Sequence, residues 1–312
     1  MTGQGHRAAD ADPLAGLDHV DWARLHHAYG PADDVPAQLR ALLSDHAEDR
    51  AGALNELTGN IYHQGTRWQA SSHALPFLAA LVDHRRTPDR PAVLSVLRAV
   101  GLGDRDDTAL PFDAQRQFAE AEAVTGRDVT AMLDWLYGGG AEDGEEGEEI
   151  FDAVAVAWER DAYLATAALA DRFVDWTADP DPVVAAQAAE LLAWFPETDA
   201  AVAALVAIPE TGDRAAARAS ANLTLAYLAA AAPETDRRLA GLLTADSVVV
   251  RLTAAVALAL RLGDRMPDLA LGVLLEARDH AADLTSEAVR LPWDRSLIGF
   301  ASLALYRVGL TP

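Results

Sequence analysis

The feature that most constrains the fold is a repeat of about 33 residues in the C-terminal half of the chain. Asp181, Asp213 and Asp246 lie 32 and 33 residues apart. Apolar or small residues follow each of them at offsets of 3, 7, 10 and 14, which is the spacing of one helix face. An aspartate at this place is a typical helix N-cap, because its carboxylate accepts hydrogen bonds from free backbone N–H groups.

A second apolar stretch follows each of these faces, so the repeat predicts stacked helix pairs. The residue at offset seven is small in every copy, being Ala188, Ser220 and Thr253. Small side chains let neighbouring helices approach closely. Chance recurrence in an alanine-rich chain is the alternative explanation.

The segments DPVVAAQAAELL at 181–192 and DSVVVRLTAAVALAL at 246–260 resemble the HEAT family of armadillo-like proteins. The resemblance implies an all-α, right-handed α-solenoid of stacked antiparallel helix pairs. The resemblance covers about 180–280 and is expected to extend over about 33–137. The N-terminal block, WARLHHAYGPADDVPAQLRALL followed by IYHQGTRWQASSHALPFL, is similar to bacterial HEAT-like proteins for which no reaction is implied. HEAT-like solenoids usually act as binding scaffolds, although a fold does not fix a function.

The rest of the chain also has helical spacing. Trp22, Leu25, His26 and Tyr29 fall on one predicted helix face, and Gly30-Pro31 ends that helix. A longer helix is expected from Ser44 or Asp45 to Gly65, and its apolar stripe is Ala47, Ala51, Leu54, Thr58 and Ile61. No stretch alternates between apolar and polar residues clearly enough to predict a sheet. Further helices are expected near 70–84, 89–101, 113–124, 127–137, 149–158 and 162–176, and the last is expected to start at Pro292.

The sequence predicts four regions. Residues 1–16 are expected to be disordered, and 17–137 to form N-terminal helical repeats. Residues 138–149 have the sequence GGGAEDGEEGEE, whose composition predicts a flexible acidic loop. Residues 150–312 hold the C-terminal HEAT-like repeats, which could continue the same solenoid.

Composition excludes several classes of function. The absence of cysteine excludes disulfides, thiolate metal sites and a cysteine nucleophile. With no signal-peptide core and no apolar run long enough to cross a bilayer, we expect a soluble cytoplasmic protein without membrane contact. The net charge of −23 disfavours nucleic acid and favours a basic partner protein. Codon bias is the competing explanation, because the chain is rich in alanine and lacks lysine.

No nucleotide loop, nucleophile elbow or zinc spacing is present, so we expect neither metal nor cofactor. Eight of nine histidines lie before residue 85, but no pair has the i, i+4 spacing of a two-histidine metal face. The chain also lacks the His-Glu dipeptides of HEAT-like iron hydroxylases.

Residues 61–78, IYHQGTRWQASSHALPFL, carry the densest chemistry. A structural interpretation makes them a polar helix junction whose next helix is capped by Ser71 or Ser72. A functional interpretation makes them the grip for a ligand or peptide, since exposed Trp and Arg are typical of interaction hot spots. The candidate binding residues are Tyr62, His63, Gln64, Arg67, Trp68 and His73, with His26 and Trp293 added from elsewhere.

The expected function is therefore a non-enzymatic HEAT-like scaffold that binds a protein or peptide, with a basic partner favoured, in an immunity-type or regulatory role. The alternative is an enzyme or small-ligand-binding protein that uses the corner at 61–78.

Overall fold

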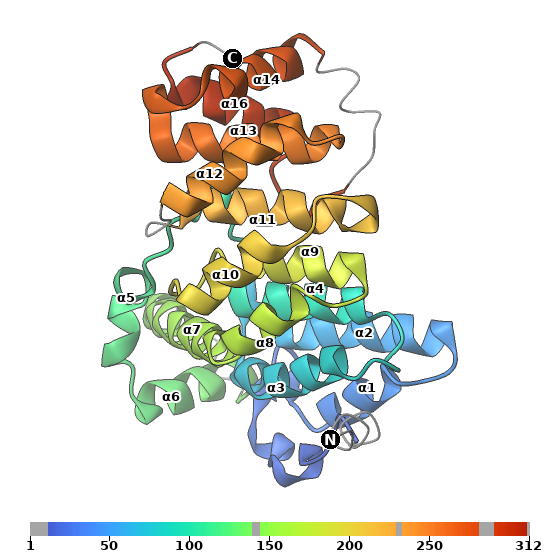
Figure 1. Ribbon diagram of the computed structural model, residues 1–312. Helices are drawn as coiled ribbons and strands as arrows, with labels where there is room; N and C mark the ends of the chain where they lie inside the picture. The colour runs from blue at the N-terminus through green and yellow to red at the C-terminus, as the bar shows by residue number, and fades with distance from the viewer. Residues whose placement is uncertain (1–11, 139–143, 229–232, 281–289, 311–312) are drawn as a thin grey trace. The chain divides into compact units, whose positions relative to one another are not determined.

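The computed structural model describes residues 12–138, 144–228, 233–280 and 290–310 (Figure 1). These residues are mostly helical, as the all-α prediction requires. Within the described ranges, two pairs of two-residue strands form two small sheets, so the prediction that the chain contains no sheet is wrong. No helix in the described part of the chain is both long and apolar enough to span a bilayer.

The chain divides into two compact units that do not follow the predicted boundaries. Unit 1 comprises Met1–Asp104 and Asp113–Leu169, and unit 2 comprises Arg105–Phe112 and Ala170–Pro312. The predicted boundary at 138–149 is wrong because a helix that starts at Gly144 packs on earlier helices and continues to Ala167. Residues 1–11 and 139–143 lie outside the described residues. Leu14, which was expected to be disordered, is buried.

Unit 1 is built from helices joined by short turns and two hairpins. Its 3-10 turns are η1 (Leu17–His19), η2 (Trp22–Arg24) and η4 (Ala119–Ala123). Its strands are β1 (His26–His27), β2 (Gly30–Pro31), β3 (Tyr62–His63) and β4 (Thr66–Arg67). Its helices are α1 (Val35–Ala41), α2 (Ala47–Ile61), α3 (Gln69–Asp83), α4 (Arg90–Leu102), α5 (Ala114–Gln117), α6 (Gly126–Tyr137) and α7 (Gly144–Ala167).

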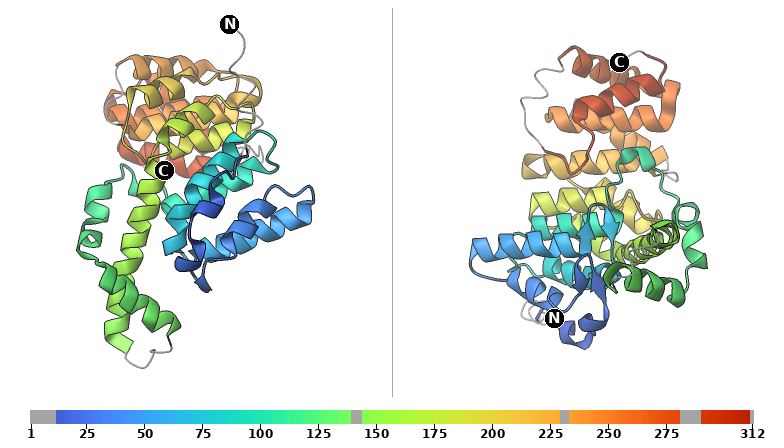
Figure 2. Two further views of the ribbon diagram at one scale, coloured as in Figure 1. Left: turned by 90° about the horizontal axis from the view of Figure 1, so that it is seen from below. Right: turned by 180° about the vertical axis from the view of Figure 1, so that it is seen from behind.

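The core of unit 1 forms where α7 packs against α3 and α4, with α6 lying along α7 (Figure 2). The spans predicted near 70–84, 89–101 and 127–137 agree closely with α3, α4 and α6. The helix predicted over 113–124 is instead split into α5 and η4. On α2 the buried positions are Ala53, Leu57, Asn60 and Ile61, so most of the predicted apolar stripe is wrong. Neighbouring elements, not the periodicity of a polar helix, choose its buried face.

The predicted helix at Trp22–Tyr29 does not form. Trp22 lies in η2 and its indole Nε1 donates to the Leu17 carbonyl oxygen at 2.9 Å. His26 and His27 form β1, which pairs with β2. The four bulky residues have helical spacing only by chance, because they belong to a 3-10 turn and a hairpin. Their spacing alone does not distinguish this arrangement from a helix.

Unit 2 is a succession of helices with one segment contributed from earlier in the chain. That segment carries the 3-10 turn η3 (Asp107–Ala109). Further 3-10 turns are η5 (Gly212–Arg214), η6 (Leu242–Thr244) and η7 (Gly263–Arg265). The helices are α8 (Ala170–Trp176), α9 (Pro182–Leu191), α10 (Asp199–Ala207), α11 (Ala215–Tyr227), α12 (Pro233–Gly241), α13 (Val248–Leu262), α14 (Asp268–Asp279) and α16 (Leu297–Arg307).

Helices α9, α11 and α13 carry the repeat and lie side by side, with α11 between the other two (Figure 1). The small residues at offset seven are fully buried there. Polar side chains bond across the helices: Ser220 Oγ donates to the Ala186 carbonyl at 2.8 Å and Thr224 Oγ1 to that of Ala189 at 2.6 Å. Close helix approach thus comes with bonds that satisfy buried hydroxyl groups.

Each of the three aspartates lies at the N-cap of its helix or directly before it, but only Asp181 is itself the N-cap. Asp181 Oδ1 accepts from the Val183 backbone N–H at 2.9 Å. Asp213 lies instead within η5, and α13 is capped by Ser247 rather than Asp246. The last helix begins at Leu297, not Pro292, because Ser296 supplies its N-cap. Short acceptors one residue away compete for the same role.

Several arginines of unit 2 bind the carbonyl ends of helices. Arg214 donates to the Thr177 carbonyl after α8, and Arg261 donates to the Leu225 carbonyl of α11. Arg218 is fully buried and donates to the carbonyls of Leu205, Val206 and Ile208 at the end of α10. Burial lowers the pKa of Arg218 to about 9, which leaves it charged at neutral pH. The guanidinium groups of these arginines therefore bind backbone carbonyls of the protein itself.

Candidate functional site

The polar residues singled out at 61–67 lie in a hairpin that directly continues α2. Strands β3 and β4 pair through Tyr62 with Arg67 and through His63 with Thr66. The turn between them holds Gln64 and Gly65, whose φ angles are 49° and 86°. Two consecutive positive φ values characterise a type I′ turn, whose twist matches that of a hairpin. Glycine adopts this conformation without strain, so Gly65 favours the turn rather than the helix end predicted for it.

The hairpin β1–β2 contacts this first hairpin and completes a corner of unit 1. The backbone N–H of Ala28 donates to the Asn60 carbonyl at 3.0 Å. The backbone N–H of His26 donates to Gln69 Oε1 at 3.2 Å. We call the residues of β1–β2 and β3–β4, with the side chains of Asp34, Asp104 and Tyr137 that bond to them, the two-hairpin corner.

Asp34 is the hydrogen-bond centre of the corner. Its Oδ1 lies 2.9 Å from His27 Nε2, and its Oδ2 accepts from Gln38 Nε2 and Asn60 Nδ2, both at 3.0 Å. All three donors are less than 10% exposed, whereas the carboxylate side chain is 48% exposed. Asp34 therefore joins β1, α1 and α2 through one group that still reaches solvent.

His27 has no nitrogen left for proton transfer to a substrate. While Nε2 contacts Asp34, Nδ1 accepts the backbone N–H of Tyr29 at 3.0 Å. This pattern requires a proton on Nε2 and a lone pair on Nδ1. The pair resembles the base and orienting carboxylate of a catalytic triad, but the position where a nucleophile would bind is occupied by backbone. His27 thus orders the hairpin.

Tyr29 links the two hairpins at the surface. Its hydroxyl lies 3.2 Å from His63 Nδ1, and the two rings meet edge to face with centroids 5.2 Å apart. The Tyr29 side chain is nevertheless 66% exposed. It is an aromatic side chain held in place by its partners yet open to solvent.

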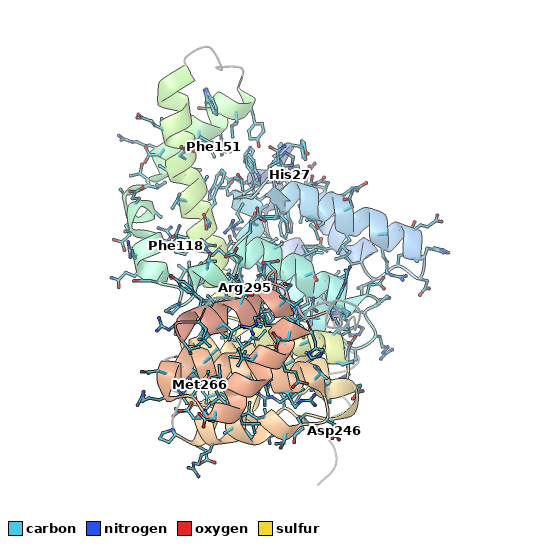
Figure 3. All side chains as sticks on the ribbon, turned by 90° about the horizontal axis from the view of Figure 1, so that it is seen from above. His27, Phe118, Phe151, Asp246, Met266 and Arg295 are labelled. Atoms are coloured by element: carbon cyan, nitrogen blue, oxygen red, sulfur yellow. The ribbon has the colours of Figure 1, made fainter. Side chains whose placement is uncertain are left out.

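Tyr137 closes the corner from α6. Its ring stacks on His26 at a centroid distance of 5.5 Å, and its hydroxyl donates to the His27 carbonyl at 2.7 Å. Burial raises the pKa of Tyr137 to about 12, so the hydroxyl stays protonated and keeps its donor role. Figure 3 shows His27 in this part of unit 1, with Phe151 on α7.

Tyr62 is fixed in a similar way on the second hairpin. Its hydroxyl donates to Asp104 Oδ1 at 2.5 Å. Burial, followed by the hydrogen bond to Asp104, raises the pKa of Tyr62 above its usual value. Neither tyrosine is suited to act as a base at neutral pH.

Arg67 and Trp68 do not lie on the surface, which corrects their place in the predicted binding site. Arg67 is 4% exposed, with Nη2 3.0 Å from Glu159 Oε1 and Nη1 donating to the Gly65 carbonyl at 3.0 Å. Trp68 packs among Met132, Val154 and Trp158. Both serve the structural interpretation, since they anchor the hairpin to α7.

The N-cap of α3 is Trp68 rather than the predicted Ser71 or Ser72, but Ser71 completes the cap from the third position of the helix. Its hydroxyl accepts the Trp68 backbone N–H at 2.7 Å and donates to the Ile61 carbonyl at 2.6 Å. It therefore satisfies the start of α3 and the end of α2 together, and much of the polarity of 61–78 has this structural purpose.

The other predicted residues are scattered. Gln64 is exposed in the turn, and His26 lies in the corner with its Nδ1 buried and without a hydrogen-bond partner. His73 is exposed on α3, and partial desolvation of its ring lowers its pKa despite the charge of Asp161. Trp293 belongs to unit 2, where it is buried and donates to Ser220 Oγ at 3.0 Å.

Sequence reasoning missed three central residues of the corner, namely Tyr29, Asp34 and Tyr137. Tyr29 was assigned to a helix face, and no functional role was predicted for the other two. The dipeptide Gln64-Gly65 was the available signal for the β3–β4 hairpin, because a glycine in a two-residue turn is typical of tight hairpins.

The described part of the corner combines fixed aromatic side chains with hydrogen-bonded carboxylates. Among the described residues, no group of three or more His, Asp or Glu side chains could hold a metal ion. Comparison with protein-family models, with curated proteins and with solved structures gave no significant match. The geometry of the corner is therefore the basis for any functional inference.

Proposed function

We propose that this chain is a non-enzymatic helical module, a right-handed HEAT-like solenoid, that binds a basic protein or peptide through the two-hairpin corner. The packing of α11 between α9 and α13, with hydroxyl bonds across those helices, supports the repeat architecture. An immunity-type or regulatory role fits such a module, because it needs binding without chemistry.

The observation that carries the proposal is that the Tyr29 side chain is both exposed and held in one position. Its side chain is 66% exposed, yet both its hydroxyl and its ring are fixed by His63. Exposed tyrosines held rigidly lose little conformational entropy on binding and dominate many interfaces. A free, flexible side chain of this size would not have this advantage.

The preference for a basic partner comes from the charges of the corner. Asp34 and Asp104 are exposed carboxylates that the hairpins hold in place, and the one arginine of the strands, Arg67, is buried against Glu159. A guanidinium group of the partner can pair with such a carboxylate and stack on the Tyr29 ring.

An enzyme that uses this corner, or a small-ligand site, is the weaker candidate. His27 has both nitrogens occupied, and the hydroxyls of Tyr62 and Tyr137 stay protonated. No general base with a free nitrogen and an orienting carboxylate therefore appears among the described residues of the corner.

The test is an affinity capture from the source lysate with the full chain, Tyr29→Ala and Tyr306→Ala. Tyr306 is the matched control because its side chain is 74% exposed on α16. A retained protein is identified by mass spectrometry, and its Kd is measured against each variant at low and high salt. We expect Tyr29→Ala to weaken binding by roughly 30-fold, the size of a hot spot, and Tyr306→Ala to leave it unchanged. Equal binding by all three forms refutes the site, and salt-insensitive binding refutes the electrostatic preference.

A further inference from the structure

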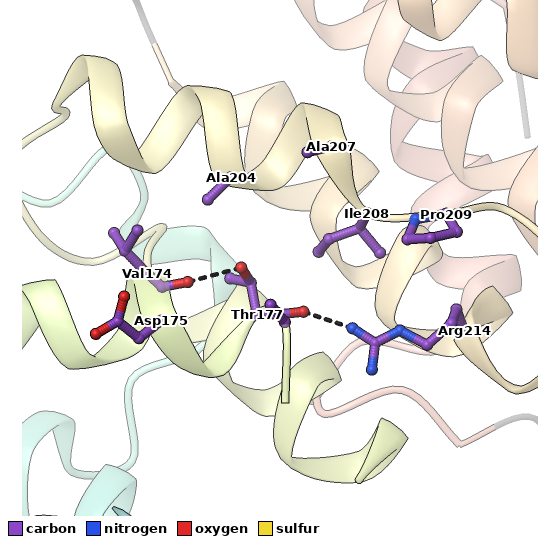
Figure 4. A pocket seen from close by; sticks show the side chains of 9 residues that line it. Val174, Asp175, Thr177, Ala204, Ala207, Ile208, Pro209 and Arg214 are labelled. Atoms are coloured by element: carbon purple, nitrogen blue, oxygen red, sulfur yellow. Dashed lines mark hydrogen bonds between the residues drawn. The ribbon is translucent and has the colours of Figure 1, made fainter. Parts of the chain in front are cut away.

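Unit 2 contains a groove between α8 and α10 that shares no residue with the two-hairpin corner. Its volume is about 490 Å³. Figure 4 shows side chains from both helices and from the segment after α10 facing it. The lining is mostly apolar and consists of Val174, Ala178, Ala204, Ala207, Ile208 and Pro209, with Asp175, Thr177 and Arg214 at its edges.

Arginine side chains hold both ends of the groove. Arg214 donates to the carbonyls of Thr177 at 2.6 Å and Asp179 at 2.5 Å, which follow α8. The buried Arg218 does the same for the end of α10. The groove is therefore built before any partner arrives, and binding there does not require the backbone to be ordered first.

The side of the groove formed by α10 is shallow and smooth. Ala204 and Ala207 are three residues apart, so they lie on the same face of the helix. Methyl side chains let another helix approach closely, whereas larger ones would hold its backbone away. This surface suits apolar side chains presented by a helix, which is a common mode of peptide recognition.

The charges around the groove specify what flanks those apolar side chains. Asp175 lines the groove, Asp171 lies one helical turn earlier on α8, and Asp213 precedes Arg214. All three are exposed, and the described residues form no ion pair with any of them. The Arg214 guanidinium is already committed to backbone carbonyls, so the rim keeps an excess of negative charge.

We propose that the α8–α10 groove docks an amphipathic helix of a partner protein, with apolar side chains in the groove and arginine or lysine opposite Asp171, Asp175 and Asp213. A second copy of this chain fits poorly, because at a net charge of −23 two copies repel each other. A nucleic acid is repelled for the same reason. This docking is a second mode of binding and does not depend on the role of Tyr29.

The experiment measures fluorescence anisotropy of labelled synthetic helical peptides with the full chain. One peptide carries leucines on one face and lysines on the other. The second has the same composition in an order that destroys the apolar face, and in the third glutamate replaces lysine. Only the first is expected to bind. Equal binding of the scrambled peptide, binding of the acidic peptide, or no binding of any peptide overturns the proposal.

Two groove variants, each with a control, test whether the peptide binds in the α8–α10 groove. Ala207→Trp fills the groove and Asp175→Lys reverses the charge at its edge, and each is expected to raise the Kd at least tenfold. The controls are Ala203→Trp, exposed on α10 but outside the groove, and Asp268→Lys, exposed on α14. Unchanged binding in Ala207→Trp and Asp175→Lys, with unchanged circular dichroism, overturns the assignment. Tyr29→Ala should bind the peptide normally, so failure of the corner and of the groove are distinguishable.

Discussion

Replacing Asp34 by alanine should destabilise the two-hairpin corner more than any other single exposed carboxylate of unit 1. The change removes the acceptor of three donors, on His27, Gln38 and Asn60, which are 4%, 7% and 8% exposed. A hydrogen bond to a charged group contributes roughly 1.5–3 kcal/mol, and a buried donor left unpaired costs a similar amount.

The sum of three such bonds overstates the effect, because the Asp34 side chain is 48% exposed and water can take its place. We therefore expect a loss of about 2–4 kcal/mol for Asp34→Ala. Asp34→Asn should give an intermediate loss, since an amide keeps one acceptor oxygen and adds a donor where none is wanted.

The assay is native-state hydrogen exchange followed by mass spectrometry, which resolves peptides from residues 17–69 and so reports on the corner rather than on the whole chain. Urea unfolding gives the accompanying change in global stability. The matched control is Asp33→Ala, which removes the same charge from an exposed neighbour for which no ion pair is described. If Asp34→Ala and Asp33→Ala differ by less than about 0.5 kcal/mol, the reasoning is refuted.

Two other positions give independent predictions. Gly103→Ala should lower the free energy of unfolding by about 1–3 kcal/mol through backbone strain, because the φ and ψ of 69° and −149° suit only glycine. A Cβ at this position would also lie 2.4 Å from Arg67 Nη1, which adds to the loss. The control Gly52→Ala, in the interior of α2 with open space around it, should stabilise by about 0.5–1 kcal/mol, and urea unfolding of both checks the contrast. His73 should make stability fall as pH drops below 6.5, since partial desolvation of its ring lowers its pKa in the folded state and the unfolded chain then binds the proton more readily. Thermal unfolding between pH 8 and 5 should show a smaller decline in His73→Gln, and identical profiles would contradict this role.

Local pattern predicted the helices well wherever a strong apolar period coincided with a cap. The spans of α3 and α4 came within one residue of the predicted ranges, because each has a regular stripe of leucine, valine and alanine. The same reasoning chose the wrong face of α2, whose apolar residues are sparse and whose buried face includes Asn60. A weak stripe leaves the choice of face to the elements that pack on it.

The sequence predicted a polar junction at 61–67 but not which of its side chains are buried. Residues 61–67 do form a polar junction beside surface aromatic residues, as the density of polar groups suggested. The burial of Arg67 and Trp68 could not be predicted from the sequence, because it depends on Glu159 and Trp158 of α7, which lie 92 and 90 positions later in the chain. Tyr29, in contrast, remains exposed because the hairpin turns it outward.

The sequence by itself determined the helical class, the close packing of small residues in the repeat and the acidic charge. These depend on composition and on residues within a few helical turns of one another. Only the tertiary structure decided which polar groups meet. Asn60 reaches Asp34 across 26 positions, Tyr137 reaches His27 across 110, and Arg295 reaches Asp107 across 188. Such pairs carry no local period, so their existence follows from how the helices pack, and the two-hairpin corner exists only because that packing brings them together.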